Sequence, residues 1–83
     1  MKVKVKLFAS YRDKIKQSEV EVELPTYAKV GSLATEMVRC YPSLTTDATK
    51  LVVAVNQEFR CHDFVLTDGD EVALIPPVSG GIS

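Results

Sequence analysis

The sequence has few of the residues that build redox, metal or nucleophilic sites. Its 83 residues include two cysteines, Cys40 and Cys61, a single histidine, His62, and no tryptophan. Two cysteines this far apart are too few for a disulfide framework or a zinc knuckle, so we expect two small, half-buried residues with free thiols in a reducing compartment. Neighbouring strand residues point to opposite faces, so Cys61 and His62 should not form a nucleophile–base pair. With no glycine-rich phosphate loop and no convergent carboxylates, we expect neither a metal nor a bound cofactor.

Excess charge and long apolar runs are also missing. Ten basic residues stand against eleven acidic ones, which gives a net charge of −1 and no broad positive field for nucleic acid. No apolar run approaches the ~20 residues that span a bilayer, and the N-terminus alternates lysine and valine where a signal peptide has an apolar block. A chain this short cannot form a two-domain enzyme with a cleft between lobes. We therefore expect a small cytoplasmic protein without membrane or nucleic-acid partners.

Two segments near the N-terminus alternate with the period of a strand that buries one face. The first sets lysines at 2, 4 and 6 against apolar residues at 3, 5 and 7, and the second sets glutamates at 19, 21 and 23 against apolar residues at 20, 22 and 24. An antiparallel pair would match the two charged faces and help to set the register. Residues 9–18 between them are expected to form a polar connection that contains Tyr11 and Ile15.

A helical period follows Pro25. The apolar stripe consists of Val30, Leu33, Ala34, Met37, Val38 and Tyr41. This spacing predicts a three-turn helix that begins between Lys29 and Ser32 and stops before Pro42.

The remaining segments read as strands and turns. A β-branched run at residues 51–55 predicts a strand, residues 56–58 a turn, and residues 59–62 and 64–66 two short strands. A turn at residues 67–70 precedes the last strand at residues 71–75, which Pro76 ends. One helix across a mixed sheet of four to five strands, with the first and last strands parallel and central, is the β-grasp fold that ubiquitin also has. We expect this α+β domain at residues 1–77 and a flexible tail at residues 78–83.

The tail has the composition of a thin, projecting arm. It reads Pro76-Pro77-Val78-Ser79-Gly80-Gly81-Ile82-Ser83. The prolines hold the chain extended and the two glycines remove side chains, so the arm could enter a narrow channel in another protein. An ordinary frayed terminus has a similar composition, and the residues alone leave both interpretations open.

Four groups of residues occur in a characteristic order along the chain. They are Phe8-Ala9 with Arg12, Ala54-Val55-Asn56-Gln57, the run LTDGDEVA at residues 66–73, and the tail motif Pro76-Pro77-Val78-Ser79-Gly80-Gly81. Together they resemble the MoaD/ThiS family of ubiquitin-like sulfur carriers, and within it the small subunits of molybdopterin synthase. The resemblance covers essentially the whole chain through Gly81.

The resemblance implies a sulfur carrier that is not catalytic alone. In this family an E1-like, MoeB-like enzyme uses ATP to adenylate the terminal glycine, and a sulfur donor then supplies the thiocarboxylate. The arm delivers this sulfur, inside the MoaE-like large subunit of a heterotetrameric synthase, to cyclic pyranopterin monophosphate and so forms the molybdopterin dithiolene of the molybdenum cofactor. Gly81 would carry the thiocarboxylate, and Gly80 would give the tail clearance.

The family's partner-binding surface is an apolar patch near the root of the tail. The matching positions are Phe8, Arg12, Phe59, Ile75, Pro76, Pro77 and Val78. Alternation supports Phe8 independently, since it follows the inward-pointing Leu7 and should face outward, as part of an interface or of the peripheral core. Arg12 and Asp68 could add charged contacts at the rim.

One departure from the family affects the chemistry directly. Members normally end at the second glycine, whereas Ile82 and Ser83 follow Gly81 here and leave it without a free carboxylate. Removal by a protease, an artefact of the assigned gene end, and loss of carrier function remain open. A thiazole-pathway carrier resembling ThiS, a ubiquitin-like protein modifier and a β-grasp binding module with an inert tail are the alternative functions.

Overall fold

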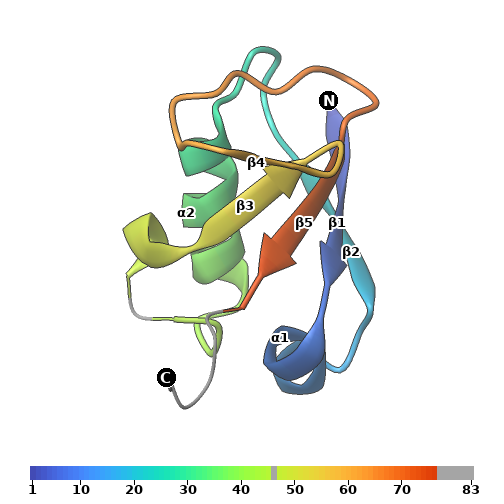
Figure 1. Ribbon diagram of the computed structural model, residues 1–83, viewed down its shortest axis with the longest axis vertical. Helices are drawn as coiled ribbons and strands as arrows, with labels where there is room; N and C mark the ends of the chain where they lie inside the picture. The colour runs from blue at the N-terminus through green and yellow to red at the C-terminus, as the bar shows by residue number, and fades with distance from the viewer. Residues whose placement is uncertain (46, 77–83) are drawn as a thin grey trace.

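The computed structural model describes residues 1–45 and 47–76. A five-stranded mixed sheet lies against helix α2 (Figure 1). The strands are β1 (Lys2–Leu7), β2 (Glu19–Glu23), β3 (Val52–Val55), β4 (Glu58–Arg60) and β5 (Glu71–Ile75), in the spatial order β2-β1-β5-β3-β4. The central strand β5 runs parallel to β1 and antiparallel to β3. This confirms the predicted architecture, including the parallel central pair.

The lysine and glutamate strands pair in the predicted register. Lys2 lies opposite Glu23, Lys4 opposite Glu21 and Lys6 opposite Glu19. The β1 lysine that forms an ion pair, Lys6, binds Glu71 of β5 at 3.1 Å and not its β2 partner Glu19. The charged faces of β1 and β2 therefore help to set the register more than they form close contacts.

The core lies between the inner face of the sheet and α2 (Val30–Cys40), whose start falls inside the predicted window. Alternate residues of the three long strands point into it, and α2 adds an apolar stripe. The largest fully buried side chains are Leu7, Leu33, Met37, Leu66 and Leu74. The N-cap residue of α2 is Lys29, whose side chain makes no capping hydrogen bond, so Ser32 lies inside the helix and does not cap it.

Residues 9–18 differ from the prediction of a polar connection. They contain a helix, α1 (Ala9–Ile15), which is followed by Lys16 in a left-handed conformation whose backbone N–H donates to the Arg12 carbonyl at 2.7 Å. Tyr11 is buried against the core and Ile15 is partly buried. The helix depends on this packing, because a seven-residue helix is marginal by itself.

The second half of the chain contains two smaller differences. A 3-10 turn, η1 (Ala48–Lys50), precedes β3, and the expected strand at residues 64–66 is reduced to a single bridge between Lys29 and Val65. Asn56 and Gln57 form the predicted turn with positive φ angles of 52° and 71°. Within the described ranges, no helix is long and apolar enough to cross a membrane.

Candidate partner-binding site

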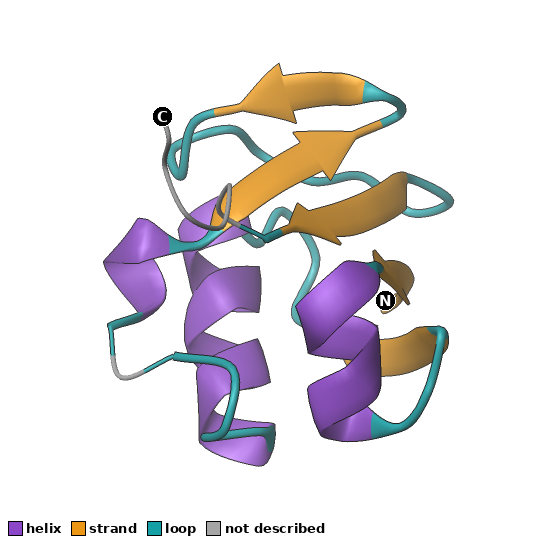
Figure 2. Cartoon of the chain, turned by 60° about the horizontal axis from the view of Figure 1, so that its bottom comes forward, coloured by secondary structure: helices purple, strands orange, loops and turns teal. Residues whose placement is uncertain are grey.

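The root of the tail lies at one end of the sheet, where β1 stops and β3 begins. Leu74 pairs with Leu7, and Ile75 pairs with Val52, the first residue of β3. Figure 2 turns this end toward the viewer and shows α1 and η1 close to it. Pro76 follows and is half-buried. The other tail residues of interest, Pro77, Val78, Gly80, Gly81, Ile82 and Ser83, lie outside the described residues.

An apolar area covers the face of the sheet that points away from α2, next to this root. Its members on β3 and β5 alternate with core residues such as Val53, Val72 and Leu74, so they must point outward, and Phe59 of β4 pairs with one of these members, Ala54. They are Phe8, Val52, Ala54, Phe59, Ala73 and Ile75, which we call the outer patch. The strand register sets Ala73, Ala54 and Phe59 in one row and Ile75 and Val52 in the next, and Phe8 directly follows Leu7, which pairs with Leu74.

The exposure of these side chains is high for apolar residues. Phe59 is 71% exposed, and Phe8 and Val52 are each 44% exposed. Ala54 is only 8% exposed, yet it does not belong to the core cluster, so the side chains around it on the outer face must be what covers it. Contiguous exposed apolar side chains of this kind mark an interaction surface. The outer patch is therefore the candidate functional site within the described residues.

Charged residues lie along one border of the outer patch. Arg12 of α1 is exposed and lines a shallow hollow together with Phe8 and Lys6. The prediction that Asp68 lies at the same rim is wrong. Asp68 belongs to the turn before β5, and five residues of strand separate that turn from the tail root, a distance of about 13 Å or more.

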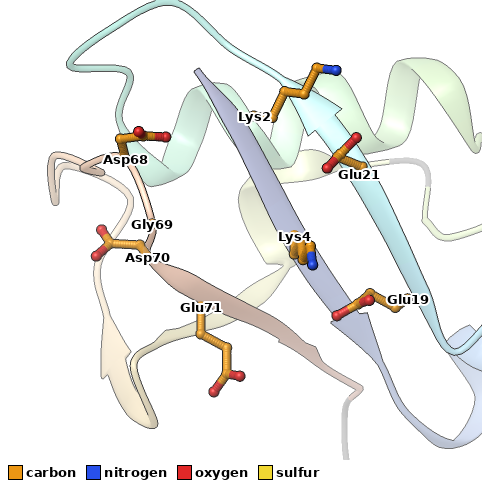
Figure 3. A pocket seen from close by; sticks show the side chains of 8 residues that line it. All are labelled: Lys2, Lys4, Glu19, Glu21, Asp68, Gly69, Asp70 and Glu71. Carbon is orange, nitrogen blue, oxygen red and sulfur yellow. The ribbon is translucent and has the colours of Figure 1, made fainter.

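The other half of the outer face is charged. A hollow over β1, β2 and the start of β5 is lined by Lys2, Lys4, Glu19, Glu21, Asp68, Gly69, Asp70 and Glu71 (Figure 3). Both signs are interspersed there, and the described part of the chain contains no group of His, Cys, Asp or Glu that could hold a metal ion. The outer face is thus charged over β1 and β2 and apolar over β5, β3 and β4.

The titratable groups with perturbed pKa values have structural roles. Burial acts to raise the pKa of Asp70, but hydrogen bonds from the Thr67 amide at 2.8 Å and the Asn56 side chain at 3.1 Å outweigh it and lower that pKa. Burial raises the pKa of the Tyr11 hydroxyl. These groups fix the turn before β5 and the packing of α1, and neither lies in the outer patch.

The histidine hydrogen-bonds to the backbone, and the two cysteines are not joined in a disulfide. His62 Nε2 donates a hydrogen bond to the Leu51 carbonyl oxygen at 2.8 Å, which ties the segment after β4 to the start of β3. Cys40 and Cys61 are free and exposed, rather than half-buried as expected. His62 is therefore a structural residue.

The structure brings together three of the residues that the sequence singled out, Phe8, Phe59 and Ile75, and places Arg12 beside them. It adds Val52, Ala54 and Ala73, which the sequence analysis did not place on the partner-binding surface. The alternation of residues 71–75 would have placed Ala73 and Ile75 on one face. The pairing of Val52 with Ile75 depends on long-range register, which the sequence does not display.

The sequence is similar to known proteins along nearly its whole length. The model of the ThiS family matches residues 5–81. The molybdopterin synthase sulfur carrier subunit of Chlamydomonas reinhardtii is 40% identical over 83 residues, which cover 98% of this chain and 100% of the relative. The subunit of the same name from Mycobacterium tuberculosis is 40% identical over 84 residues, which cover 98% of this chain and 99% of the relative.

Solved structures show the same fold. SAMP1 from Haloferax volcanii, a small archaeal modifier protein, superposes with a TM-score of 0.83 at 30% identity and covers 98% of this chain and 100% of its own. The putative molybdopterin converting factor subunit 1 from Pyrococcus furiosus superposes with a TM-score of 0.79 at 36% identity and covers 94% and 99%. Both support the β-grasp architecture over nearly the full length.

Proposed function

The chain belongs to the ThiS family, and on this premise we propose that it is a sulfur carrier, the small subunit of a molybdopterin synthase. The observation that supports this most directly is the position of the outer patch. Phe8, Val52 and Phe59 expose apolar surface around the strand that leads into Gly80 and Gly81. A partner that covers the patch would thereby receive the tail.

The proposed chemistry takes place at the C-terminal carboxylate of Gly81, after Ile82 and Ser83 have been removed. A carboxylate oxygen attacks the α-phosphorus of ATP in the activating enzyme, and pyrophosphate leaves. A hydrosulfide equivalent from a donor protein then attacks the acyl carbon and displaces AMP, which leaves a thiocarboxylate. A glycine at this position allows close approach, because it has no Cβ to collide with the partner.

The large subunit would supply the catalytic residues for the next step. Inside it, the thiocarboxylate sulfur would be transferred to cyclic pyranopterin monophosphate, and two such transfers would form the dithiolene. The outer patch would bury its apolar surface against this subunit and fix the root of the tail, so that the arm reaches the substrate in one orientation.

A second candidate function is protein modification. SAMP1 is named as a modifier, and this chain shares 30% identity with it over nearly the full length of both. A modifier would form an amide between Gly81 and a lysine of a target protein, whereas a carrier would hold sulfur there. A thiazole-pathway carrier would also form a thiocarboxylate but would pass it to a different acceptor.

Intact-mass analysis of the protein from its native host tests the carrier role. The expected species ends at Gly81 and has one oxygen replaced by sulfur. A chain that always ends at unmodified Ser83 would refute the carrier role for this form, and Gly81 found in amide linkage to other proteins would favour the modifier.

Reconstitution identifies the pathway. A thiocarboxylated chain ending at Gly81, mixed with the large subunit and precursor, should yield the dithiolene product, and the absence of product would rule out the molybdopterin assignment. Phe8→Asp should weaken binding to the large subunit without unfolding the domain. Unchanged affinity would remove Phe8 from the interface.

A further inference from the structure

The end of the molecule that surrounds the tail root is positively charged, although the whole chain has a net charge of −1. Two connecting segments lie at this end, residues 8–18 after β1 and residues 41–45 and 47–51 before β3. Together they contain four basic and two acidic residues, a net charge of +2. The basic residues are Arg12, Lys14, Lys16 and Lys50, which we call the basic rim.

Among the described residues, the basic rim has no ion-pair partner. The ion pairs found among residues 1–45 and 47–76 join Lys6 to Glu71, Arg39 to Glu36 and Arg60 to Glu58, and none uses a rim residue. Of the two acids in these segments, Asp47 is already engaged, because its carboxylate accepts hydrogen bonds from the Thr49 amide at 3.0 Å and hydroxyl at 2.6 Å. All four rim side chains are exposed.

The basic rim is continuous with the outer patch. Arg12 lines one hollow with Phe8 and a second with Lys16. Lys14 and Lys50 line a third hollow together with Tyr11 of α1 and Leu44. A protein that covers the outer patch and takes the tail therefore lies against the rim.

The opposite end of the sheet has no such excess of one sign, because Lys2 and Lys4 lie opposite Glu23 and Glu21 there. Asp68 and Asp70 of the turn before β5 line the same hollow as Lys2, Lys4 and Glu21 (Figure 3). The net positive charge of the two connecting segments thus lies at the end from which the tail leaves. A charge asymmetry of this kind orients a protein during diffusional encounter with a charged partner.

We propose that the activating enzyme presents an acidic surface around the site where it takes the tail, and that the basic rim orients the chain on approach. This inference rests on the proposed function. The complex with the activating enzyme is transient, because the carrier must leave it to deliver sulfur. Complementary charges outside the buried contact raise the association rate without adding much to the lifetime, which suits such a complex.

Charge reversal at the two ends of the domain tests the proposal. Lys14→Glu with Lys50→Glu reverses charge at the tail end, and Lys2→Glu with Lys29→Glu is the matched control near the other end. Both variants change the net charge equally, so only the position of the change differs. Stopped-flow association of each full-length chain with the activating enzyme is measured at about 50 mM and about 500 mM NaCl, where screening lengths differ several-fold.

The tail-end variant should associate at least about tenfold more slowly than wild type in low salt and nearly as fast in high salt, and the control should stay within about twofold. Equal effects of both variants, or faster association of the tail-end variant, would overturn the proposal. If circular dichroism shows that the tail-end variant is unfolded, Arg12→Glu with Lys16→Glu, which changes the net charge by the same amount, replaces it under the same criteria. Failure of wild type to bind the activating enzyme at all would refute the proposed function instead.

Discussion

Truncation of Phe59 to alanine separates binding from folding. Phe59 lies on β4, a three-residue edge strand whose residues are all exposed, and Phe59 as a whole residue is 71% exposed. Most of the ring makes no contact within the domain. We therefore expect Phe59→Ala to change the free energy of unfolding, measured by urea titration, by less than ~0.5 kcal/mol.

The affinity for the large subunit should change far more. A fully buried phenylalanine covers ~150–250 Å², so the exposed 71% leaves ~110–180 Å² for a partner to cover. At ~25 cal/mol per Å² this area corresponds to ~3–4 kcal/mol. Alanine keeps Cβ, so the truncation should cost ~2–3 kcal/mol, a ~30- to 150-fold increase in Kd.

Isothermal titration calorimetry of the chain with the large subunit measures this change, and Tyr27→Ala is the matched control. Tyr27 is also a highly exposed aromatic residue, at 75%, but it lies in the loop between β2 and α2 at the end of the sheet away from the tail. Its truncation should leave Kd unchanged. If Phe59→Ala binds within about threefold of wild type, or if Tyr27→Ala weakens binding as much, the outer patch is not the binding surface.

Three other measurements test the turn before β5 and the tail. Asn56→Ala should lower the free energy of unfolding by about 2 kcal/mol in urea titration. The change removes the hydrogen bond that the Asn56 side chain donates to Asp70 and the one that it accepts from the Glu71 amide, and it puts alanine in a left-handed conformation. A loss below about 0.5 kcal/mol contradicts this. Because the pKa of Asp70 is lowered in the folded protein, its contribution to stability is complete above about pH 4 and is lost as the pH falls through the pKa of the folded state. Asp70→Asn should therefore flatten the acid side of the plot of unfolding free energy against pH. An unchanged slope would argue against this. A chain ending at Gly81 should support ATP–pyrophosphate exchange by the activating enzyme, whereas the chain with Ile82 and Ser83 should not; equal rates would show that removal is unnecessary.

The strands were predictable because their patterns are local and mutually consistent. Lysines at alternate positions of β1 and glutamates at alternate positions of β2 indicate both the period and the pairing, and the observed register matches Lys4 with Glu21. Asn56 was also identifiable as a turn residue, since asparagine tolerates the left-handed conformation better than most residues.

Helix α1 could not be predicted in the same way. It has a single pair of apolar residues at helical spacing, Tyr11 and Ile15, so no periodic stripe can be detected. It forms because Tyr11 packs into the core that the distant strands build, which is a tertiary effect. The bridge at Val65 has a similar explanation, because its partner Lys29 is in another segment of the chain.

The candidate site was predictable in part. The resemblance pointed to Phe8, Phe59 and Ile75, and the alternation of β1 placed Phe8 outside the core. Val52 and Ala54 were missed, because a continuous β-branched run does not reveal which of its residues face the solvent until the pairing with β5 is known. The predictions for Gly80 and Gly81 concern residues outside the described ranges and stay predictions.

The outer face itself shows why the outer patch requires a partner. Over β1 and β2, the same face of the same sheet has lysine and glutamate side chains, which hydrate well and pair across strands. The fold therefore does not need apolar residues on this face. Over β3 and β4 it nevertheless exposes Val52 and Phe59, at an edge strand where apolar surface promotes aggregation. A surface that adds nothing to the core and creates this liability is explained when another protein covers it, and its position around the end of β5 is where a protein that accepts the tail must bind.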